Sequence, residues 1–516
     1  MLSGLDYIVL AAYLVVIASI GLAVGRGQRS TRDYFLAGNR APWWAAGLSI
    51  IATEASALTF IGAPIQSLRG DWTYVQLVVG SSLARFAVAG LLIGVYYRAE
   101  VVTVYDYLAE RFGTVSRNLA AGLFFVGRML GSGVRLYGAA IALVIVADLP
   151  FPLAIAAIAA VAAFYTILGG LRSVIWTDSV QAILLFGGAL LALVYLYRDA
   201  GLDAGAIVST LKDATTAAGH SKLRMLDLSL DPRVAYTLAA GVVGSAFLTM
   251  SIHGTDQDMM QRALACREAQ AGRKSLILSA VLVVPIAVLF LAVGSLLWIH
   301  YGGDAGAAAA AGEIAAAKGL GAPAKGFDFL FPLYVVRELP GGIRGLILAA
   351  LFATAMSSLD SAISALSTTA VRCVWQPYVQ PGRDDSHYLK VARALAFGFA
   401  LLLVGVALFV WLSEGAGGER QGFGVLMLGL KVLTWVFPPL LGVFLVGVLT
   451  SRGTDSGNLL AVSIGIGLLL AVEFWGGLVG GEPPFAWTWN PLVGCAVTFA
   501  VAAAFRGRAG AVAGPR

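Results

Sequence analysis

Long apolar runs separated by short polar segments dominate this chain. A helix needs about 20 mostly apolar residues to cross a bilayer, and the runs bounded by charge or by Gly and Pro predict about 13 such spans. They lie near 5–25, 43–68, 72–97, 118–147, 150–168, 173–197, 233–253, 275–300, 341–370, 389–412, 425–449, 459–478 and 487–505. The pattern predicts an all-α polytopic membrane protein that forms a single transmembrane domain over residues 1–516.

Composition supports this class. Hydrophobic residues make up 59% of the chain and charged residues 12%, against about 25% charged in a soluble protein. The net charge of +6 does not indicate a nucleic-acid partner, because the basic residues flank the spans instead of forming a patch. The three cysteines are far apart and form no disulfide or zinc pattern. The first apolar run has no basic n-region or cleavage pattern, which favours a retained span over a signal peptide.

Lys and Arg in short loops predict the orientation. The loops 26–42, 98–117, 254–274 and 371–388 are rich in arginine, whereas the short opposite loops hold only Arg69. We therefore expect the plasma (inner) membrane as the location, with the N-terminus outside and the C-terminus in the cytoplasm.

Two longer segments, 198–232 and 301–340, are predicted to lie outside as caps, with a surface helix at Ala305–Ala317. Neither has room for a separate soluble domain. The chain contains no GxxxxGK[ST], GxSxG or HExxH motif, so ATP-driven and hydrolytic chemistry have no support and we do not expect an enzyme.

The span near 341–370 carries more oxygen atoms than a lipid-facing helix tolerates. Thr354, Ser357, Ser358 and Ser361 share one helical face, and Asp360 flanks it. A carboxylate at bilayer depth costs at least about 2.5–3.5 kcal/mol unless it faces a cavity or a partner. Oxygen ligands without nitrogen or sulfur suit a hard cation such as Na⁺. Hydroxyls that only join helices or bond to backbone carbonyls are the alternative.

The second span, 43–68, contains IATEASALTFIGAP. Glu54 lies at membrane depth, while Gly62 and Pro64 weaken the helix. Broken membrane helices free backbone carbonyls, and transporters use them for substrate and ion sites. A Pro-kinked packing helix is the alternative, which Glu54 argues against.

Other charged residues are expected near the spans. Arg128 and Arg135 are seven residues apart on one face; either they pair with Glu54, Asp178 or Asp360, or one binds a substrate carboxylate through a bidentate fork. Arg85 is a further candidate partner for an acid, and Lys431 is a buried or snorkelling cation. Asp178 either caps a helix start or has a functional role. The run Gly254–Arg262 is expected in a solvated cytoplasmic loop with a gating or stabilising role.

Four motifs in this order resemble those of the sodium/solute symporter family, whose members carry sugars, proline, sialic acid and monocarboxylates. They are the LAGNRAPWWAAGLSIIATEASALTFIG run at Leu36–Gly62, GGLRSVIWTD at Gly169–Asp178, TDQDMMQR at Thr255–Arg262 and ATAMSSLDS at Ala353–Ser361. Together they are specific, and the likeness covers roughly residues 5–450.

The resemblance implies a LeuT-type core of two inverted five-helix repeats. The first repeat would span 43–197 and the second 233–449, with an extra N-terminal helix at 5–25 and extra C-terminal helices at 459–505. It also implies a Na⁺ site between the broken helix and the span near 341–370. The implied residues are Ala52, Ala55, Thr354, Ser357 and Ser358, with Thr354 contributing a carbonyl.

A second Na⁺ site of some relatives would correspond to Asp178, Ser357, Asp360 and Ser361, although an acid at Asp360 departs from the usual Ser or Ala. Substrate positions of the family fall on residues of three spans and are joined here by the two arginines. They are Glu54, Ser56, Thr59, Gln76, Thr249, His253, Arg128 and Arg135. Sugar transporters carry an amide where this chain has Glu54, whereas proline transporters carry an acid.

These features predict a Na⁺-coupled secondary active symporter that imports a small organic solute by alternating access, with an amino acid or carboxylate favoured over a sugar. The expected partners are Na⁺, the solute and the lipid bilayer. A proton-coupled carrier, in which Glu54, Asp178 or Asp360 titrates, is the alternative. A transporter-like solute sensor is a further one. The sequence leaves substrate, stoichiometry and oligomeric state open.

Overall fold

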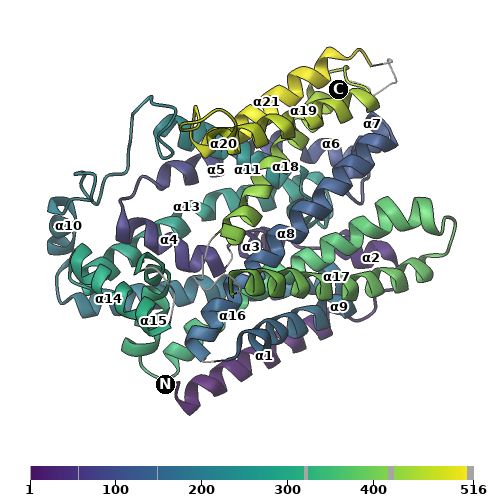
Figure 1. The fold of residues 1–516 in the computed structure, drawn as a ribbon. Coiled ribbons are helices and arrows are strands. Elements are labelled where there is room, and N and C mark those ends of the chain that lie inside the picture. Colours follow the sequence, from purple (N-terminus) through teal and green to yellow (C-terminus); the bar gives the residue numbers. More distant parts are fainter. Residues whose placement is uncertain (1, 56, 148, 319–322, 416–423, 508–516) are drawn as a thin grey trace.

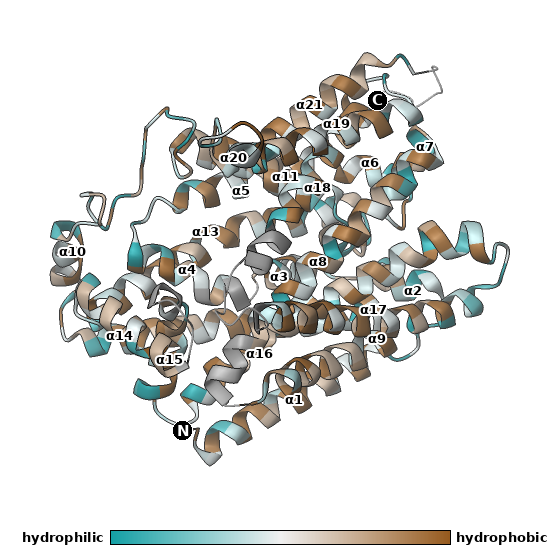
Figure 2. Ribbon diagram, viewed as in Figure 1, coloured by the Kyte–Doolittle hydropathy of each residue, from teal (hydrophilic) through white to brown (hydrophobic). Residues whose placement is uncertain are grey.

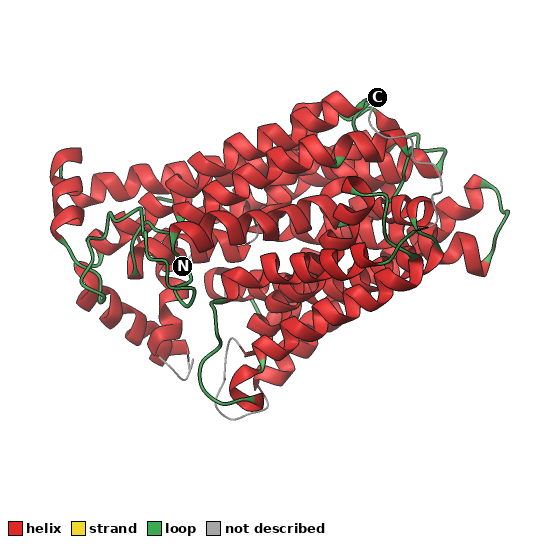
Figure 3. Ribbon diagram, turned by 90° about the horizontal axis from the view of Figure 1, so that it is seen from above, coloured by secondary structure: helices red, strands yellow, loops and turns green. Residues whose placement is uncertain are grey.

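The computed structural model describes residues 2–55, 57–147, 149–318, 323–415 and 424–507. Within these ranges the chain forms helices joined by loops, together with two isolated β-bridges (Figure 3). Ten helices are long and apolar enough to cross a membrane. In Figure 2 the apolar residues follow the long helices, and the hydrophilic ones gather at the two ends of the bundle. The expectation of an all-α polytopic protein is confirmed.

The elements of the first half are α1 (Gly4–Gly25), α2 (Thr31–Leu36), η1 (Ala37–Asn39), α3 (Trp43–Glu54), α4 (Ala57–Arg69), α5 (Val75–Leu91), α6 (Ile93–Arg98), α7 (Val104–Arg111), α8 (Thr114–Ala147), α9 (Phe151–Ala200) and α10 (Ala204–Asp213). Those of the second half are η2 (Ala240–Gly244), α11 (Ser245–Thr255), α12 (Gln257–Leu264), α13 (Ala269–His300), α14 (Gly303–Lys318), η3 (Pro323–Phe329), α15 (Leu330–Glu338), α16 (Ile343–Ala370), η4 (Val371–Val379), α17 (Asp385–Gly415), α18 (Gly424–Leu449), α19 (Asp455–Glu473), α20 (Trp475–Leu478), η5 (Trp487–Trp489) and α21 (Asn490–Ala504).

The predicted spans and the long helices differ at three places. The second span is two short helices, α3 and α4, because the backbone leaves the helical region at Ala55. The fifth and sixth spans are the two halves of α9, which Gly170 separates with φ +56°. The seventh span becomes helical only from Leu238 and includes the π-helical turn Ala240–Gly244. The two spans made of short helices, and the two spans joined in α9, explain why ten long helices and not 13 appear among the described residues.

Helix α16 lies at the centre of the bundle. It packs against α9, α8, α17, α1 and α3, and its residues from Ile347 to Ala370 are all buried. In Figure 1 the long helices run side by side. The helices α10, α14 and α15 gather with the N-terminus at one end, and α2, α6 and α7 lie toward the opposite end. Other helices, not lipid, surround α16, so its many hydroxyls lie where they can form hydrogen bonds with protein groups.

Helix α1 is joined to α16 by polar contacts at its first turn. Asp6 Oδ1 accepts from the backbone N–H groups of Gly342 (2.8 Å) and Gly345 (2.9 Å), and Arg344 donates to Asp6 Oδ2 at 2.9 Å. Ser3 and Asp6 also form a capping box. A carboxylate at a helix N-terminus satisfies otherwise unpaired N–H groups, so this one acid fixes two helices to each other.

Candidate functional site

The break between α3 and α4 faces the hydroxyl row of α16. Ser357 Oγ donates to the carbonyl oxygen of Ala52 at 2.8 Å, and also lies 3.3 Å from the carbonyl oxygen of Thr354. Thr354 Oγ1 donates back to the Leu351 carbonyl at 2.7 Å, so its carbonyl, not its hydroxyl, is available at this face. Ala55, just past the end of α3, is buried too. The structure thus brings together the predicted residues of the Na⁺ site.

Ser358 completes this arrangement. Its side chain is buried, and its Oγ makes no hydrogen bond within the described part of the chain. A buried hydroxyl without a partner costs about 1–3 kcal/mol, and a cation held by neighbouring oxygens removes that cost. The donor set of hydroxyls and carbonyls, free of nitrogen and sulfur, suits Na⁺.

The second group of predicted ion ligands is built differently. Asp178 Oδ2 accepts from Ser49 Oγ at 2.5 Å and from Arg262 Nη2 at 3.2 Å. Asp360 accepts hydrogen bonds from Tyr165 and, at 3.1 Å, from Ser361. All of these side chains are buried. Asp360 therefore neither joins Asp178 directly nor pairs with an arginine; its partners are a phenol and a hydroxyl. Asp178 sits inside α9, so the helix-cap interpretation is wrong.

Helix α12 corrects the expectation of a solvated loop at Gly254–Arg262. Every residue of α12 is buried. Arg262 donates to Ser49 Oγ at 2.7 Å and also contacts Ser361 and Asp258. Its guanidinium therefore connects α12 with α3, α9 and α16. An arginine can satisfy several acceptors at once because its fork carries five N–H donors, which is why this charged segment is buried.

The two arginines of α8 have different surroundings. Arg128 forms ion pairs with Asp256 and, at 2.8 Å, with Asp258. Structural pairing was one of the two alternatives, but the expected partners Glu54, Asp178 and Asp360 were wrong. The pairing with Asp256 and Asp258 replaces the prediction that Arg128 meets the substrate. Arg135 forms no ion pair with a described residue, and its Nη1 is buried without a hydrogen bond to one.

Glu54 lies at the end of α3, next to the break. It forms an ion pair with Arg85 of α5, whose Nε donates to His253 Nε2 at 3.3 Å. His253 Nδ1 lies 3.2 Å from the Thr249 carbonyl oxygen, so the bonding pattern fits a neutral ring that carries its proton on Nδ1. The Glu54 side chain keeps 34% of its surface exposed. The predicted residues Glu54, Thr249 and His253 thus share one cluster.

The remaining predicted substrate residues fall in three classes. Thr59 is partly buried on α4, while Ser56 lies outside the described residues. Gln76 is buried and bonded to the outer loop, because it donates to the Tyr236 carbonyl at 3.0 Å and accepts from the Asp227 N–H at 3.2 Å. Sequence reasoning missed this contact, since the loop has no local signal that it folds back onto α5. Lys431 is not buried; it pairs with Glu473 and is 45% exposed.

The C-terminal end of α4 is held by the two long segments that the sequence predicted as caps. Lys222 Nζ donates to the Leu68 carbonyl at 2.9 Å and lies 3.3 Å from Asp304 of α14. Arg69 stacks on the ring of Phe327, with its guanidinium carbon 4.8 Å from the centroid. Burial raises the pKa of the nearby Asp328 carboxyl from its ordinary 3.8 to about 6, although Arg69 lowers it.

A family model described as the sodium:solute symporter family matches residues 34–465. This chain belongs to that family. It is accordingly a Na⁺-coupled symporter and a multi-pass membrane protein, not an enzyme, which confirms the predictions of family, coupling ion and class.

Several curated proteins are similar to this symporter. It is 28% identical to the sodium/sialic acid symporter NanT of Aliivibrio fischeri, over 91% of this chain and 88% of that one. It is 29% identical to the human sodium/iodide cotransporter (91% and 69%) and 27% identical to the human sodium-coupled monocarboxylate transporter 1 (92% and 73%). These relatives carry different solutes, so the family leaves the substrate open.

Solved structures give the fold. A Na⁺-coupled sialic acid symporter in a substrate-bound outward-open state superposes with a TM-score of 0.83, at 23% identity and covering 97% of each chain. Mhp1, a nucleobase–cation symporter in a closed conformation, gives a TM-score of 0.51 at 13% identity, covering 90% of this chain and 92% of that one. This likeness confirms the predicted LeuT-type fold.

Proposed function

We propose that this symporter imports a small organic carboxylate, amino acids included, and that Arg135 binds the carboxylate group. The observation that carries the proposal is the buried Nη1 of Arg135, which has no partner among the described residues. Glu54 and Arg85 neutralise each other, and His253 fits a neutral ring. A neutral sugar would leave Arg135 unpaired, whereas a carboxylate forms charge-assisted bonds with it.

Na⁺ would bind between the Ala52–Ala55 segment and the Thr354, Ser357 and Ser358 face of α16. The fit of Ser357 to the Ala52 carbonyl and the unpartnered Ser358 hydroxyl support this assignment. An ion there fixes the break between α3 and α4, which also positions Glu54. Na⁺ and solute therefore raise each other's affinity, and one charge crossing 100 mV supplies about 2.3 kcal/mol.

Two further proposals follow from the same reasoning. The repeats are taken as 43–197 and 233–449, on either side of the outer segment that contains Lys222. The N-terminus is taken to be outside and the C-terminus in the cytoplasm, because the arginine-rich short loops belong on the cytoplasmic side. Figure 1 supports opposite sides, since the N-terminus and the end of α21 lie at opposite ends of the bundle.

The test is uptake into proteoliposomes that contain the purified full-length chain. Matched solute pairs, each a small carboxylate and its amide, are compared under an inward Na⁺ gradient and with choline replacing Na⁺. We expect at least one carboxylate to accumulate with Na⁺, and its amide to be transported at least about 30-fold less efficiently, as for loss of a buried charge pair. Na⁺-driven uptake of a neutral sugar that no carboxylate inhibits would overturn the carboxylate proposal.

A further inference from the structure

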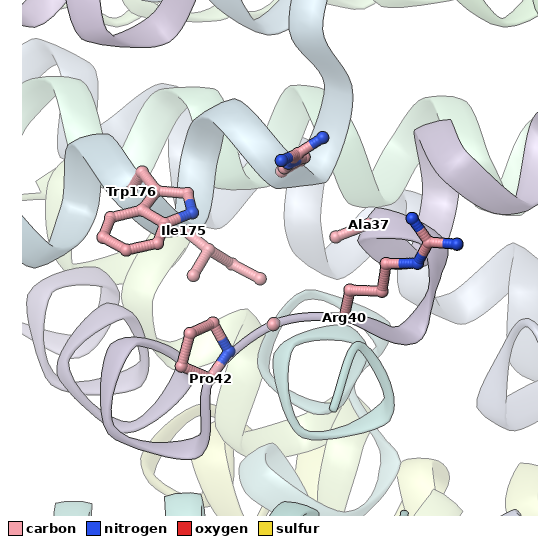
Figure 4. Close-up of a pocket in the computed structure, with 7 residues that line it drawn as sticks. Ala37, Arg40, Pro42, Ile175 and Trp176 are labelled. Carbon is pink, nitrogen blue, oxygen red and sulfur yellow. The ribbon is translucent and has the colours of Figure 1, made fainter. Parts of the chain in front are cut away.

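A cavity opens beside the start of α3, and none of its lining residues belongs to the proposed solute site. It is lined by Ala37, Arg40, Ala41 and Pro42 from the segment that leads into α3, and by Arg172, Ile175 and Trp176 of α9. Its volume is about 390 Å³ including its open mouth. In Figure 4 Trp176, Ile175 and Pro42 lie together on one side of it, and Arg40 lies on the other.

The backbone around the cavity is fixed by contacts with the rest of the protein. Ala41 pairs with Cys266 in a parallel β-bridge, and its N–H donates to the Ala265 carbonyl at 3.1 Å. Asn39 Nδ2 donates to the Leu264 carbonyl at 2.8 Å. On the other wall, the positive φ of Gly170 starts the second half of α9 just before Arg172. The cavity is therefore a built feature of two rigid segments.

Two guanidinium groups line this cavity from different elements. Arg40 and Arg172 are exposed, and within the described part of the chain neither side chain forms an ion pair or a hydrogen bond. Arg267, also exposed, follows directly after Cys266, the bridge partner of Ala41. Two arginines of the same side are partnered instead: Arg32 donates to Asn39, and Arg111 to three backbone carbonyls. Two unpaired guanidinium groups at one cavity attract an anion, and their planar forks match phosphate oxygens.

The surroundings of the cavity indicate which anion reaches it. Trp43 and Trp44, the residues directly after Pro42, are each 41% exposed. Trp44 packs edge-on against Trp176, with the two ring centroids 5.6 Å apart. Exposed tryptophans in a membrane protein mark the headgroup level. Helix α13 packs against α3 and exposes Ile277 and Val281, as a lipid-facing helix does.

We propose that this cavity binds the phosphate of an anionic phospholipid headgroup, held between Arg40 and Arg172, with the acyl chains along the tryptophans and α13. Basic pockets at the cytoplasmic membrane surface are suited to such headgroups. The headgroup joins the start of α3 to α9. These are the same two helices that the Ser49–Asp178 hydrogen bond joins deeper in the membrane. The lipid thus stabilises the contact that closes the cytoplasmic side of the ion site.

The test is native mass spectrometry of the purified full-length symporter titrated with phosphatidylglycerol or with phosphatidylcholine. We expect one tightly bound phosphatidylglycerol that phosphatidylcholine does not replace. At about fivefold per arginine near an anionic surface, the double variant Arg40→Gln/Arg172→Gln should bind it about 30-fold more weakly. The charge-preserving variant Arg40→Lys/Arg172→Lys should keep most of the affinity, which separates loss of the site from loss of the fold.

The matched control is Arg26→Gln/Arg383→Gln, which removes two exposed arginines of the same side that do not line the cavity. It should leave the bound lipid unchanged. Equal lipid affinity in the cavity variant and the wild type, or an equal loss in the control, overturns the proposal. Inorganic phosphate forms the last arm: displacement of the lipid by phosphate at equal concentration would assign the site to free phosphate instead. None of these outcomes depends on which solute is transported.

Discussion

Two regions along helix α8 use the same residue type in opposite ways. Arg128 is paired with Asp256 and Asp258, and the neighbouring Arg262 is bonded to Asp258, Asp178 and Ser361. About 10 Å further along the helix, Arg135 has no ion-pair partner among the described residues. A buried charge held in ion pairs stabilises one arrangement of helices, whereas a buried charge without an ion-pair partner is available to a ligand. The ion-pair partners of each arginine, more than its residue type, distinguish a structural role from a ligand-binding role here.

The largest effect expected from this contrast is on stability. Arg128→Met leaves Asp256 buried without its cation and leaves Asp258 with Arg262 alone, and breaking a buried ion pair costs about 3–5 kcal/mol. The midpoint of thermal unfolding of the purified protein should fall accordingly. The double variant Arg128→Met/Asp256→Asn should recover much of the loss. A single variant as stable as the wild type would show that the ion pairs of Arg128 contribute nothing to the fold.

The second effect is on transport. Arg135→Met removes a guanidinium without a protein partner, so the unfolding midpoint should stay the same or rise. Uptake should drop about 30- to 1000-fold in kcat/KM, the equivalent of about 2–4 kcal/mol for a buried charge pair with the solute. Arg135→Lys should retain part of the activity because it keeps the charge without the fork. Lowered stability with unchanged uptake would reverse the assignment of the two arginines.

The third effect concerns the carboxyl of Asp328, which lies in η3 next to the end of α4. The folded-state pKa of Asp328 is about 6 against an ordinary 3.8, so the folded protein binds this proton more tightly than the unfolded chain. Its contribution to stability is full below about pH 4 and is lost as the pH rises to about 6. Asp328→Asn should therefore exceed the wild type in stability by at most about 3 kcal/mol above pH 6. The difference should vanish near pH 4, and thermal unfolding over this pH range measures it.

The smallest effect expected is on Na⁺ affinity. Ser358→Ala removes a hydroxyl that has no described partner, so stability without Na⁺ should not fall, while the Na⁺ concentration for half-maximal uptake should rise about five- to tenfold. Ser364→Ala is the matched control, because Ser364 Oγ on the same helix is likewise buried and without a described partner. An equal shift in both variants would contradict a specific role for Ser358.

Local sequence signals predicted the spans and the hydroxyl face of α16, because each depends on residues near one another in the chain. They also predicted a weakened second helix, but at Gly62 and Pro64, which lie inside α4, whereas the helix is broken after Glu54. The burial of α12 was not predicted, because the sequence does not show which residues pair with its acids and with Arg262. Charged residues without a known partner are expected in solvent. Arg128 lies 128 residues from Asp256. A signal was nevertheless present: three arginines at membrane depth required acidic partners, and Asp256 and Asp258 were acids that could pair with them. The contact of Gln76 with the outer loop had no such signal.

The contacts of Asp6 with the first turn of α16 have a consequence for the order of assembly in the membrane. Asp6 leaves the ribosome long before Arg344, which follows 338 residues later. At about 5–20 residues per second, this interval is roughly 20–70 s. During that time the carboxylate has only the capping box with Ser3 as a protein partner for its charge. Helix α1 can pack against α9 earlier, but its contact with α16 has to wait for the second half of the chain.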